Sequence, residues 1–307
     1  MKTKNTEALI SIVTATYNRS EILSFTIKSV LNQTYTNWEL LIIGDCCTDD
    51  TESVVASFKD KRITFYNFEK NFGEQSKPNN YGVQHAKGSY IAFLNHDDIW
   101  FNDHLEGLMS TLKKNESDLV YSWHYPAPID DEVELINCVS TDKTHRYNFV
   151  APASTWLFKK RMFDEIGPWR SYKEVYGAPS QDWLARMYKN GKKITVLNKF
   201  TVVAIQSGKR KNSYVNQEQT ENAIHYDQVT NNPFFREEIL TKYFVYYSNQ
   251  NNDSVLFFFK KGILNFLKKT ILVFGIRPVV LKHFIRYRKK GAFINKLRKT
   301  RGLKEIR

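Results

Sequence analysis

The chain has 307 residues, of which 42% are hydrophobic and 14% aromatic, a composition that supports a folded core and excludes global disorder. The formal net charge is +13, but residues 260–307 hold 16 lysines and arginines against one acid, so the rest of the chain carries a net charge of −2. Three irregularly spaced cysteines exclude a disulfide framework and a zinc pattern, and they are typical of a reducing cytoplasm.

Strands and helices are predicted to alternate over the first 124 residues. Short β-branched apolar runs indicate buried strands, and apolar residues spaced three or four apart indicate helices. The predicted strands are 8–15, 38–44, 62–68, 89–94 and 118–124. The predicted helices are 20–33, with Ser20 as N-cap, then 48–58, 79–88 and 102–115. Short connections between them favour a mostly parallel, doubly wound, Rossmann-like sheet.

After residue 125 the regular alternation stops. We expect an irregular segment or hairpin over 125–149 and a strand that runs into a helix over 154–167. A helix over 180–191, one or two strands over 192–206, and a polar helix or loop over 212–232 follow. From about residue 234 the chain is predicted to be a helical, amphipathic tail.

Polar and small residues follow four predicted strands, at 14–18, 44–50, 68–73 and 95–98. The carboxyl ends of parallel strands meet at one edge of the sheet, where ligands bind, so we expect one crevice there. Tyr17 suits either stacking on a base or covering the core edge. Asp45 suits either a hydrogen bond from a base or ribose, or a helix cap.

Each of two acidic stretches can be interpreted as a functional site or as an ordinary structural feature. The stretch Asn-His-Asp-Asp at 95–98 suits a hard divalent cation bridged to phosphate oxygens, or an ordinary turn and helix cap. Asp182 lies beside an aromatic residue at a predicted helix start. It suits a general base near apolar surface, or an acid favoured by the helix dipole. The order of these features along the chain is more specific than any one of them.

The chain resembles the family 2 inverting glycosyltransferases, which have the GT-A fold, from about residue 9 to about 206. The stretches that carry the resemblance are ISIVTATYNR, SVLNQTYTNWELLIIGDCCTDDT, NFGEQSKPNNYGVQHAKGSYIAFLNHDDIW and SQDWLARMYKNG. A GT-A domain over residues 1–232 is thereby implied, with a nucleotide-binding half to about 124, an acceptor-binding half from about 125, and the tail over 233–307.

The resemblance also implies roles for nucleotide-binding residues. The family's P-x-Y-N stretch corresponds to Ala15-Thr16-Tyr17-Asn18 and places Ala15 and Tyr17 beside the uracil. The acidic pair of its D-D-G-S stretch retains only Asp45, which would bind the base. A basic residue usual in its R-N-x-G stretch is Asn79 here, and Lys77 is the candidate for the lost charge.

The family's D-x-D-D stretch corresponds to residues 95–98. Its metal-binding acid falls on Asp97, and the acid that meets the ribose is replaced by Asn95, which brings no charge. His96 would meet the sugar or diphosphate, or make a local structural hydrogen bond. The E-D base motif corresponds to Gln181-Asp182 and implies Asp182 as catalytic base.

The implied activity is a metal-assisted, inverting sugar transfer from a nucleotide-sugar, most commonly a UDP-sugar, with Mn²⁺ or Mg²⁺. The implied acceptor is a hydroxyl of a glycan or polyprenyl-linked molecule in bacterial polysaccharide, O-antigen or capsule assembly. A non-catalytic nucleotide- or glycan-binding relative is the alternative, because Gly44, Asn79 and Asn95 depart from the family pattern. A nucleic-acid-binding protein is a weaker alternative, because no recognised binding motif accompanies the basic tail.

The sequence pattern of the tail indicates where in the cell the protein acts. No signal peptide and no ordinary transmembrane helix are expected. Lysine pairs at 260–261 and 268–269 alternate with apolar clusters, a pattern typical of helices that lie on anionic membrane surfaces. We therefore expect a cytoplasmic protein, peripheral on the inner face of the membrane. A helical appendage packed on the domain or on a second subunit is the alternative, and the sequence is compatible with a homo-oligomer.

Overall fold

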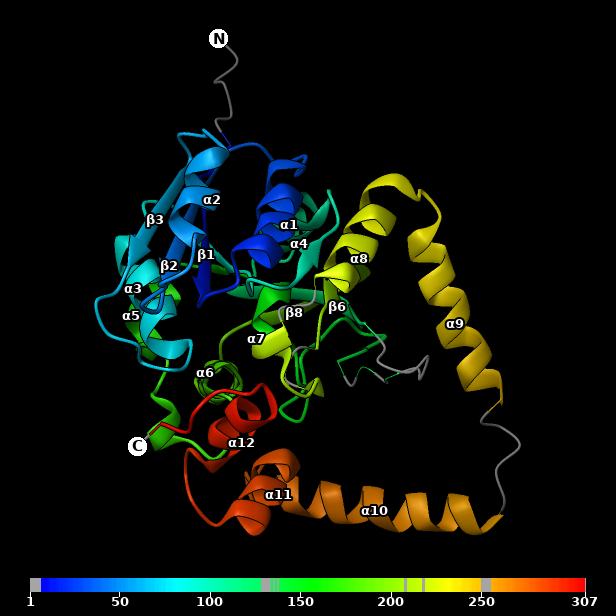
Figure 1. Cartoon of the computed structure of the whole chain (residues 1–307). Helices are drawn as coiled ribbons and strands as arrows, with labels where there is room; N and C mark the ends of the chain where they lie inside the picture. Colours follow the sequence, from blue (N-terminus) through cyan, green and yellow to red (C-terminus); the bar gives the residue numbers. More distant parts are fainter. Residues whose placement is uncertain are drawn as a thin grey trace.

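The computed structural model describes residues 7–127, 134, 136, 138–206, 209–216, 219–249 and 255–306. One eight-stranded sheet lies at the centre of this part of the chain, in the order β3-β2-β1-β4-β7-β6-β8-β5 (Figure 1). The strands are β1 (Ile10–Thr16), β2 (Trp38–Gly44), β3 (Ile63–Asn67), β4 (Tyr90–Phe93), β5 (Ile99–Trp100), β6 (Leu119–Pro126), β7 (Trp156–Lys159) and β8 (Ile194–Ala204).

Helices cover both faces of the sheet and then continue into the tail. Those of the first 232 residues are α1 (Ser20–Leu31), α2 (Thr51–Ser57), α3 (Ser76–His85), α4 (His104–Lys114), α5 (Arg161–Ile166), α6 (Pro179–Lys189), α7 (Ser213–Asn216) and α8 (Thr220–Asn231). Two short 3₁₀ turns, η1 (Ala153–Thr155) and η2 (Tyr172–Glu174), flank α5. The tail holds α9 (Phe235–Asn249), α10 (Val255–Val273), α11 (Pro278–Tyr287) and α12 (Ala292–Thr300).

The doubly wound α/β sheet expected from the sequence is confirmed, with one qualification. The half made of β3, β2, β1 and β4 is parallel throughout. In the second half, β7 runs antiparallel to both β4 and β6, β5 runs antiparallel to β8, and only β6 and β8 are parallel. The second half is therefore mixed, because the chain enters β7 from the irregular segment after β6 and not from a crossover helix.

The continuous apolar runs form strands that are buried on both faces. Along β1, Ile12 packs on one side with α1 and α4, and Val13 packs on the other with α3 and α6. Neither side chain has any exposed surface. Because successive side chains of a strand point to opposite faces, a run without polar positions is what such a two-sided core requires.

Local differences from the predicted elements have simple causes. Ser20 was expected to cap the first helix but is its first residue. Its N–H is bound at 3.3 Å by the Asp49 carboxylate, which also accepts the N–H of Thr51 at the start of α2.

The helix predicted over 79–88 is α3, which begins at Ser76 and ends at His85. The two-residue strand β5 was not predicted. The irregular segment after β6 is confirmed for its described residues, and 128–133, 135 and 137 lie outside them.

The tail packs on the domain at its two ends. In α9, the side chains of Phe235, Ile239 and Tyr243 join the large core, with ring contacts to Phe101, Tyr125 and Phe200. Far along the chain, α12 lies beneath α6 and α7 (Figure 1). Between them, α10 presents exposed side chains at residues 264–270. Among the described residues, none of the helices combines the length and the apolar character needed to cross a membrane. The boundary at residue 232 falls between α8 and α9 and remains a prediction.

Candidate active site

Two adjoining cavities open where β1, β2 and β4 end. The first, of about 150 Å³, includes Ala15, Thr16 and Asp45 in its wall. The second, of about 230 Å³, includes Asn95 and Asp97. Gln75, Leu297 and Arg301 line both cavities, so together they form one crevice, whose volume falls within the ~300–1,000 Å³ typical of ligand sites. The predicted convergence of the strand ends is confirmed.

Asp45 organises the loop that follows β3. Its two carboxylate oxygens accept the backbone N–H groups of Phe72 at 2.8 Å and Gly73 at 2.7 Å, and its own carbonyl accepts the Asn71 amide. Burial raises the pKa of Asp45, while these N–H groups and the Arg298 guanidinium act in the opposite direction. Each carboxylate oxygen has a further lone pair, so the side chain can still accept a hydrogen bond from a ligand.

The two adjacent carboxylates of the 95–98 turn have different surroundings. Asp98 is buried and accepts hydrogen bonds from Ser154, from the Asn95 amide at 2.8 Å and from the backbone N–H of Ile205 at 3.0 Å. Burial and the charge of Asp97 raise the pKa of Asp98 to about 8. Asp98 therefore ties the turn to η1 and to the end of β8, while Asp97 lines the crevice.

His96 connects two distant parts of the chain. Its Nδ1 lies 3.1 Å from the carbonyl of Ala15, and its Nε2 lies 3.2 Å from the hydroxyl of Tyr214 in α7. Burial lowers the pKa of this imidazole, against the charge of Asp97. With both ring nitrogens in contact, the geometry supports the structural interpretation of His96, and Ala15 takes part through its backbone.

The other expected nucleotide-binding residues lie around the crevice and do not line either cavity. Tyr17 is half-buried beyond the end of β1. Burial lowers the pKa of the Arg298 guanidinium, and Asp45 and Tyr17 act in the opposite direction. Lys77 is exposed on α3, with its ammonium 5.8 Å from the Phe72 ring centroid. Asn79 is buried on the same helix.

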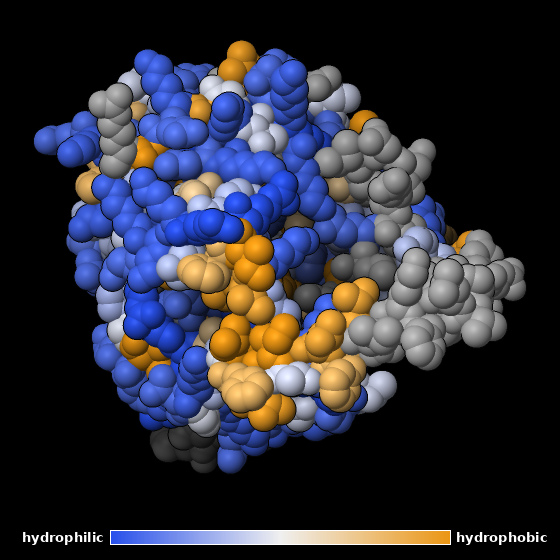
Figure 2. All heavy atoms as spheres, turned by 90° about the horizontal axis from the view of Figure 1, so that it is seen from below, coloured by the Kyte–Doolittle hydropathy of each residue, from blue (hydrophilic) through white to orange (hydrophobic). Residues whose placement is uncertain are grey.

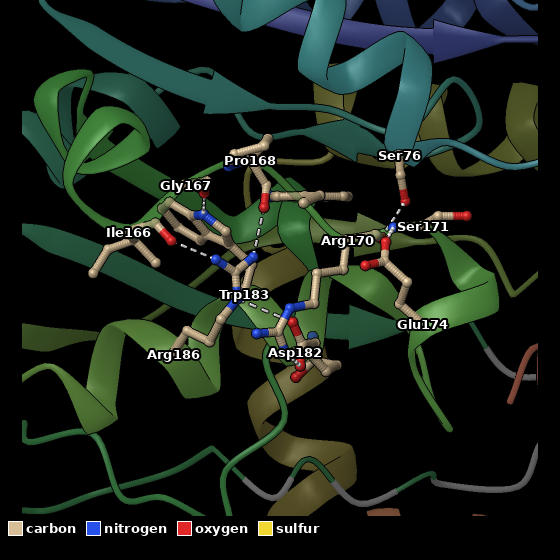
Figure 3. A network of polar contacts seen from close by, with 12 residues as sticks. Ser76, Ile166, Gly167, Pro168, Arg170, Ser171, Glu174, Asp182, Trp183 and Arg186 are labelled. Carbon is tan, nitrogen blue, oxygen red and sulfur yellow. Dashed lines mark hydrogen bonds and ion pairs between the residues drawn. The ribbon is translucent and has the colours of Figure 1, made fainter.

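Asp182 lies in the first turn of α6, inside a network of arginines (Figure 3). One carboxylate oxygen is 3.0 Å from Arg186 Nε, and the other is 3.5 Å from Arg170 Nη1. Arg186 also donates to the carbonyls of Ile166 and Pro168, which fixes α6 against the end of α5. Asp182 does not line the crevice, although Ala178 and Pro179 at the start of the same helix do.

Four tryptophans of the domain are mainly core residues. Trp156, Trp169 and Trp183 are each at most 2% exposed and pack against one another. Trp123 packs edge-on against Phe200. These tryptophans therefore have the packing role that their apolar surroundings favour.

Several residues of the crevice were not anticipated from the sequence. Tyr214 contributes from α7, and residues of α12 and the turn after it complete the wall. The Arg19 and Arg301 guanidinium groups lie 4.6 Å and 5.7 Å from the Tyr214 ring centroid. The sequence signal for α12 is the helical spacing of Leu297 and Arg301, but the same spacing occurs throughout the tail.

The donor atoms of the crevice decide how a divalent cation would be held. Within the described part of the chain, no three side chains of His, Cys, Asp and Glu are grouped as a metal site. Asp97 is 5% exposed and offers a hard carboxylate ligand, whereas the Asn95 amide is engaged with Asp98. These residues fit a metal held by one carboxylate and completed by ligand oxygens and water, as Mg²⁺ and Mn²⁺ allow.

Comparison with sequence profiles identifies the family of this chain. The sequence profile described as "Glycosyl transferase family 2" matches residues 11–166, about half of the chain. The chain therefore belongs to glycosyl transferase family 2, as its sequence motifs predicted.

Curated relatives include three bacterial glycosyltransferases. The UDP-Glc:alpha-D-GlcNAc-diphosphoundecaprenol beta-1,3-glucosyltransferase WfgD of Escherichia coli is 40% identical over 113 residues, covering 37% of this chain and 44% of the relative. The putative teichuronic acid biosynthesis glycosyltransferase TuaG of Bacillus subtilis is 36% identical, covering 33% and 41%. The poly(ribitol-phosphate) beta-N-acetylglucosaminyltransferase TarP of Staphylococcus aureus is 40% identical, covering 36% and 35%. The chain thus spans less than half the length of these relatives.

Solved structures share the fold. The S. aureus TarS fragment 1–349 in complex with UDP-GlcNAc superposes with a TM-score of 0.56 at 19% identity, covering 77% of this chain and 72% of that one. The mannosyltransferase PcManGT of Pyrobaculum calidifontis, in complex with GDP-Man and Mn²⁺, superposes with a TM-score of 0.56 at 13% identity, covering 96% and 88%. This likeness confirms the GT-A fold.

Proposed function

We propose that this protein is an inverting glycosyltransferase that moves a sugar from a nucleotide-sugar, with UDP as the preferred nucleotide, to a hydroxyl of a glycan or polyprenyl-linked acceptor. The pathway would be the assembly of a bacterial surface polysaccharide. The observation that carries the proposal is the placement of Asp45 and Asp97 in one crevice at the strand ends of a family 2 fold. UDP is supported by two similar proteins, the UDP-Glc-dependent WfgD and the TarS fragment in complex with UDP-GlcNAc.

Each cavity would bind a different part of the donor. The cavity beside Asp45 would take the nucleoside, with Asp45 accepting a hydrogen bond from the base and Tyr17 lying beyond the cavity wall. The cavity beside Asn95 and Asp97 would take the metal-binding end of the donor and its sugar. Because the base is far from the reacting carbon, its contacts orient the donor and do not enter the chemical step.

Asp97 would be the protein's ligand to a divalent cation, either Mn²⁺ or Mg²⁺, at the diphosphate end of the donor. When bound, such a cation neutralises charge on the departing diphosphate. Asn95 holds the turn through its bond to Asp98 and leaves Asp97 as the one carboxylate of the 95–98 stretch that lines the cavity. We therefore expect weaker metal affinity than a site with two carboxylates would have.

Asp182 would act as the general base. It takes the proton of the acceptor hydroxyl while that oxygen attacks the anomeric carbon from the face opposite the diphosphate, so that the C–O bond to the diphosphate breaks and configuration inverts. Arg170, whose side chain is half exposed, is the partner that must yield for an acceptor to approach Asp182. The less exposed Arg186 would remain and orient the carboxylate.

The test is release of UDP from a panel of UDP-sugars, with and without Mn²⁺, by the full chain and by Asp97→Ala and Asp182→Asn. Loss of a general base typically costs ~10²–10⁴-fold in rate. We expect Asp182→Asn to lose turnover while still binding UDP, and Asp97→Ala to lose the response to Mn²⁺. Asp164→Asn, an exposed acid in the first turn of α5, is the matched control.

The outcomes of this screen separate the alternatives. A chain that binds UDP-sugars but turns none over, with any acceptor offered, would be the non-catalytic relative. A chain that binds no nucleotide-sugar at all would contradict the proposed function. Full activity of Asp182→Asn would remove that residue as the base while leaving the activity itself standing.

We also propose that the tail holds the enzyme at the inner surface of the cytoplasmic membrane. Apolar side chains gather on the face that carries α10 and α11 (Figure 2), and the exposed ones include Phe266, Val273, Phe274 and Ile285. A neighbouring groove of about 830 Å³, which also includes Glu305, is lined by several cationic side chains: Lys173, Arg288, Lys289, Lys290, Lys296 and Lys299. Apolar insertion and anionic lipid attraction together suit a peripheral membrane helix.

Flotation with liposomes that contain anionic lipid tests the membrane proposal. Deleting the tail would also remove α12 from the crevice, so substitutions on exposed residues are sharper. We expect Val273→Ser with Phe274→Ser to reduce flotation and leave nucleotide binding unchanged. Val215→Ser, an exposed apolar residue of α7, is the control. Flotation equal to that of the unaltered protein would place the membrane contact elsewhere or exclude it.

A further inference from the structure

The tail supplies part of the wall of the crevice. Arg298 donates to the carbonyl of Gly73 at 2.5 Å, and the side chain of Ile306 packs directly on Gly73. On the other side, the N–H of Asn212 binds the carbonyl of Thr300 at 2.7 Å. Helix α12 is thus fastened both to the loop that Asp45 organises and to the segment before α7.

Arg301 lies where the two cavities meet. It lines the cavity beside Asp45 as well as the cavity beside Asp97. If the nucleoside occupies the first and the sugar occupies the second, as proposed above, the group that joins them is the diphosphate. The position of Arg301 at the junction therefore corresponds to the diphosphate of the donor.

The Arg301 guanidinium has N–H donors that the described protein groups do not use. Its Nε is buried and has no hydrogen-bond partner among the described residues. The same holds for Nε of Arg19, whose guanidinium also lies near the Tyr214 ring. A guanidinium carries five N–H donors, and Arg301 lines both cavities, so an oxyanion there can bond to the part of the group that faces the cavity.

Arg298 has a different environment from Arg301. Its Nη1 binds the Gly73 carbonyl and its Nε binds the Lys304 carbonyl at 2.8 Å. With these bonds it holds α12 against the Asp45 loop. Arg298 is therefore placed to position the wall, whereas Arg301 is placed to touch the ligand.

We propose that Arg301 is a diphosphate ligand and a catalytic residue, and that Arg298 positions the helix that carries it. This rests on the proposed function. Bidentate hydrogen bonds from a guanidinium to phosphate oxygens would hold the donor and neutralise the charge that grows on the leaving diphosphate. A permanent cation from the tail thereby supplements the single carboxylate of Asp97, and the tail is part of the catalytic unit.

The test is titration of the full chain with UDP, UMP and uridine, in EDTA and in Mn²⁺. A charged hydrogen bond of this kind corresponds to roughly 10- to 100-fold in affinity. We expect Arg301→Gln to lose that factor for UDP in both solutions and to bind uridine unchanged. Lys299→Gln is the matched control, because Lys299 lies on α12 but lines the groove of about 830 Å³ and neither cavity of the crevice. Arg301→Lys keeps the charge without the planar fork, and we expect intermediate affinity for UDP.

Each outcome decides between interpretations. If Arg301→Gln binds UDP as tightly as the unaltered chain, Arg301 is not a ligand. If it binds more tightly, α12 obstructs the site and does not complete it. If Arg301→Gln does not fold, Arg301→Lys decides, and unchanged UDP affinity in that variant overturns the proposal. If the unaltered chain binds no nucleoside diphosphate, both this proposal and the proposed function fail.

Discussion

At the residue scale, the two arginines around Asp182 differ in their exposure and in the number of acceptors that they bind. The Arg186 side chain is 16% exposed and serves three acceptors among the described residues, whereas the Arg170 side chain is 51% exposed and makes one ion pair there, at 3.5 Å. Hydrogen bonds to buried charged groups contribute more than exposed ion pairs, because water competes for the exposed ones. Arg186 is therefore structural, and Arg170 is free to exchange its partner.

Substitution of these arginines tests that difference. Arg186→Met leaves the Asp182 carboxylate and the carbonyls of Ile166 and Pro168 without their donor, so we expect a loss of about 3 kcal/mol in the free energy of unfolding. Arg170→Met should cost less than about 1 kcal/mol. Thermal and denaturant unfolding of both variants provide the measurement. Equal losses would show that the two arginines contribute alike.

Some residues of the crevice could be predicted from the local sequence, and others could not. The positions of Asp45, Asn95 and Asp97 at the strand ends could be predicted, because each lies within a few residues of a strand whose apolar run marks its end. Tyr214 and Arg301 could not, because their place in the crevice depends on how distant segments pack. Asp98 shows the limit of motif reading, since only the structure identifies its three donors.

At the element scale, apolar periodicity predicted the strands and helices of the first half well, because burial on one or two faces is what the pattern records. It did not predict β5, which is two residues long, or the direction of β7. Strand direction depends on the path of the preceding segment, which has no periodicity. The tail helices were predicted, but the docking of α12 was not, because its arginines resemble the solvent-exposed ones of α11.

The contact between α3 and β1 depends on a glycine. A Cβ added at Gly82 would lie 2.4 Å from Cγ1 of Val13, in the fully buried core. At Gly107 in α4, the nearest atom is Cδ2 of Leu197 at 3.2 Å, the end of a side chain that can rotate. Both glycines lie in helices, so the difference between them isolates the packing.

We expect Gly82→Ala to destabilise the protein by about 1–3 kcal/mol, because α3 must move off the sheet. Gly107→Ala should be neutral or stabilising by up to about 1 kcal/mol, since alanine favours the helix. Thermal midpoints of the two variants give the comparison. A shift for Gly82→Ala no larger than that for Gly107→Ala would contradict the close packing of α3 on β1.

At the scale of the whole molecule, the core holds several neutral histidines. Burial lowers the pKa of His104 and His145 to about 3, and of His124 and His225 to about 4. In the unfolded chain a histidine titrates near 6.5. Between these values the unfolded state binds more protons than the folded state, so acidification from about pH 6.5 towards pH 4 reduces stability.

His104 gives the sharpest measure of this effect. Its ring is fully buried, stacks on Trp100 and bonds Thr201 at 2.7 Å, and the charge of Asp103 only partly offsets the burial. At pH 5 its share of the lost stability is about 2 kcal/mol, from about 1.4 kcal/mol for each pKa unit. His104→Asn removes the titrating group, so its stability should fall less between pH 7.5 and pH 5 than that of the unaltered chain. The same substitution at exposed His85 is the control. Unfolding curves at the two pH values decide, and an undiminished fall in His104→Asn would assign the acid sensitivity to the other buried histidines.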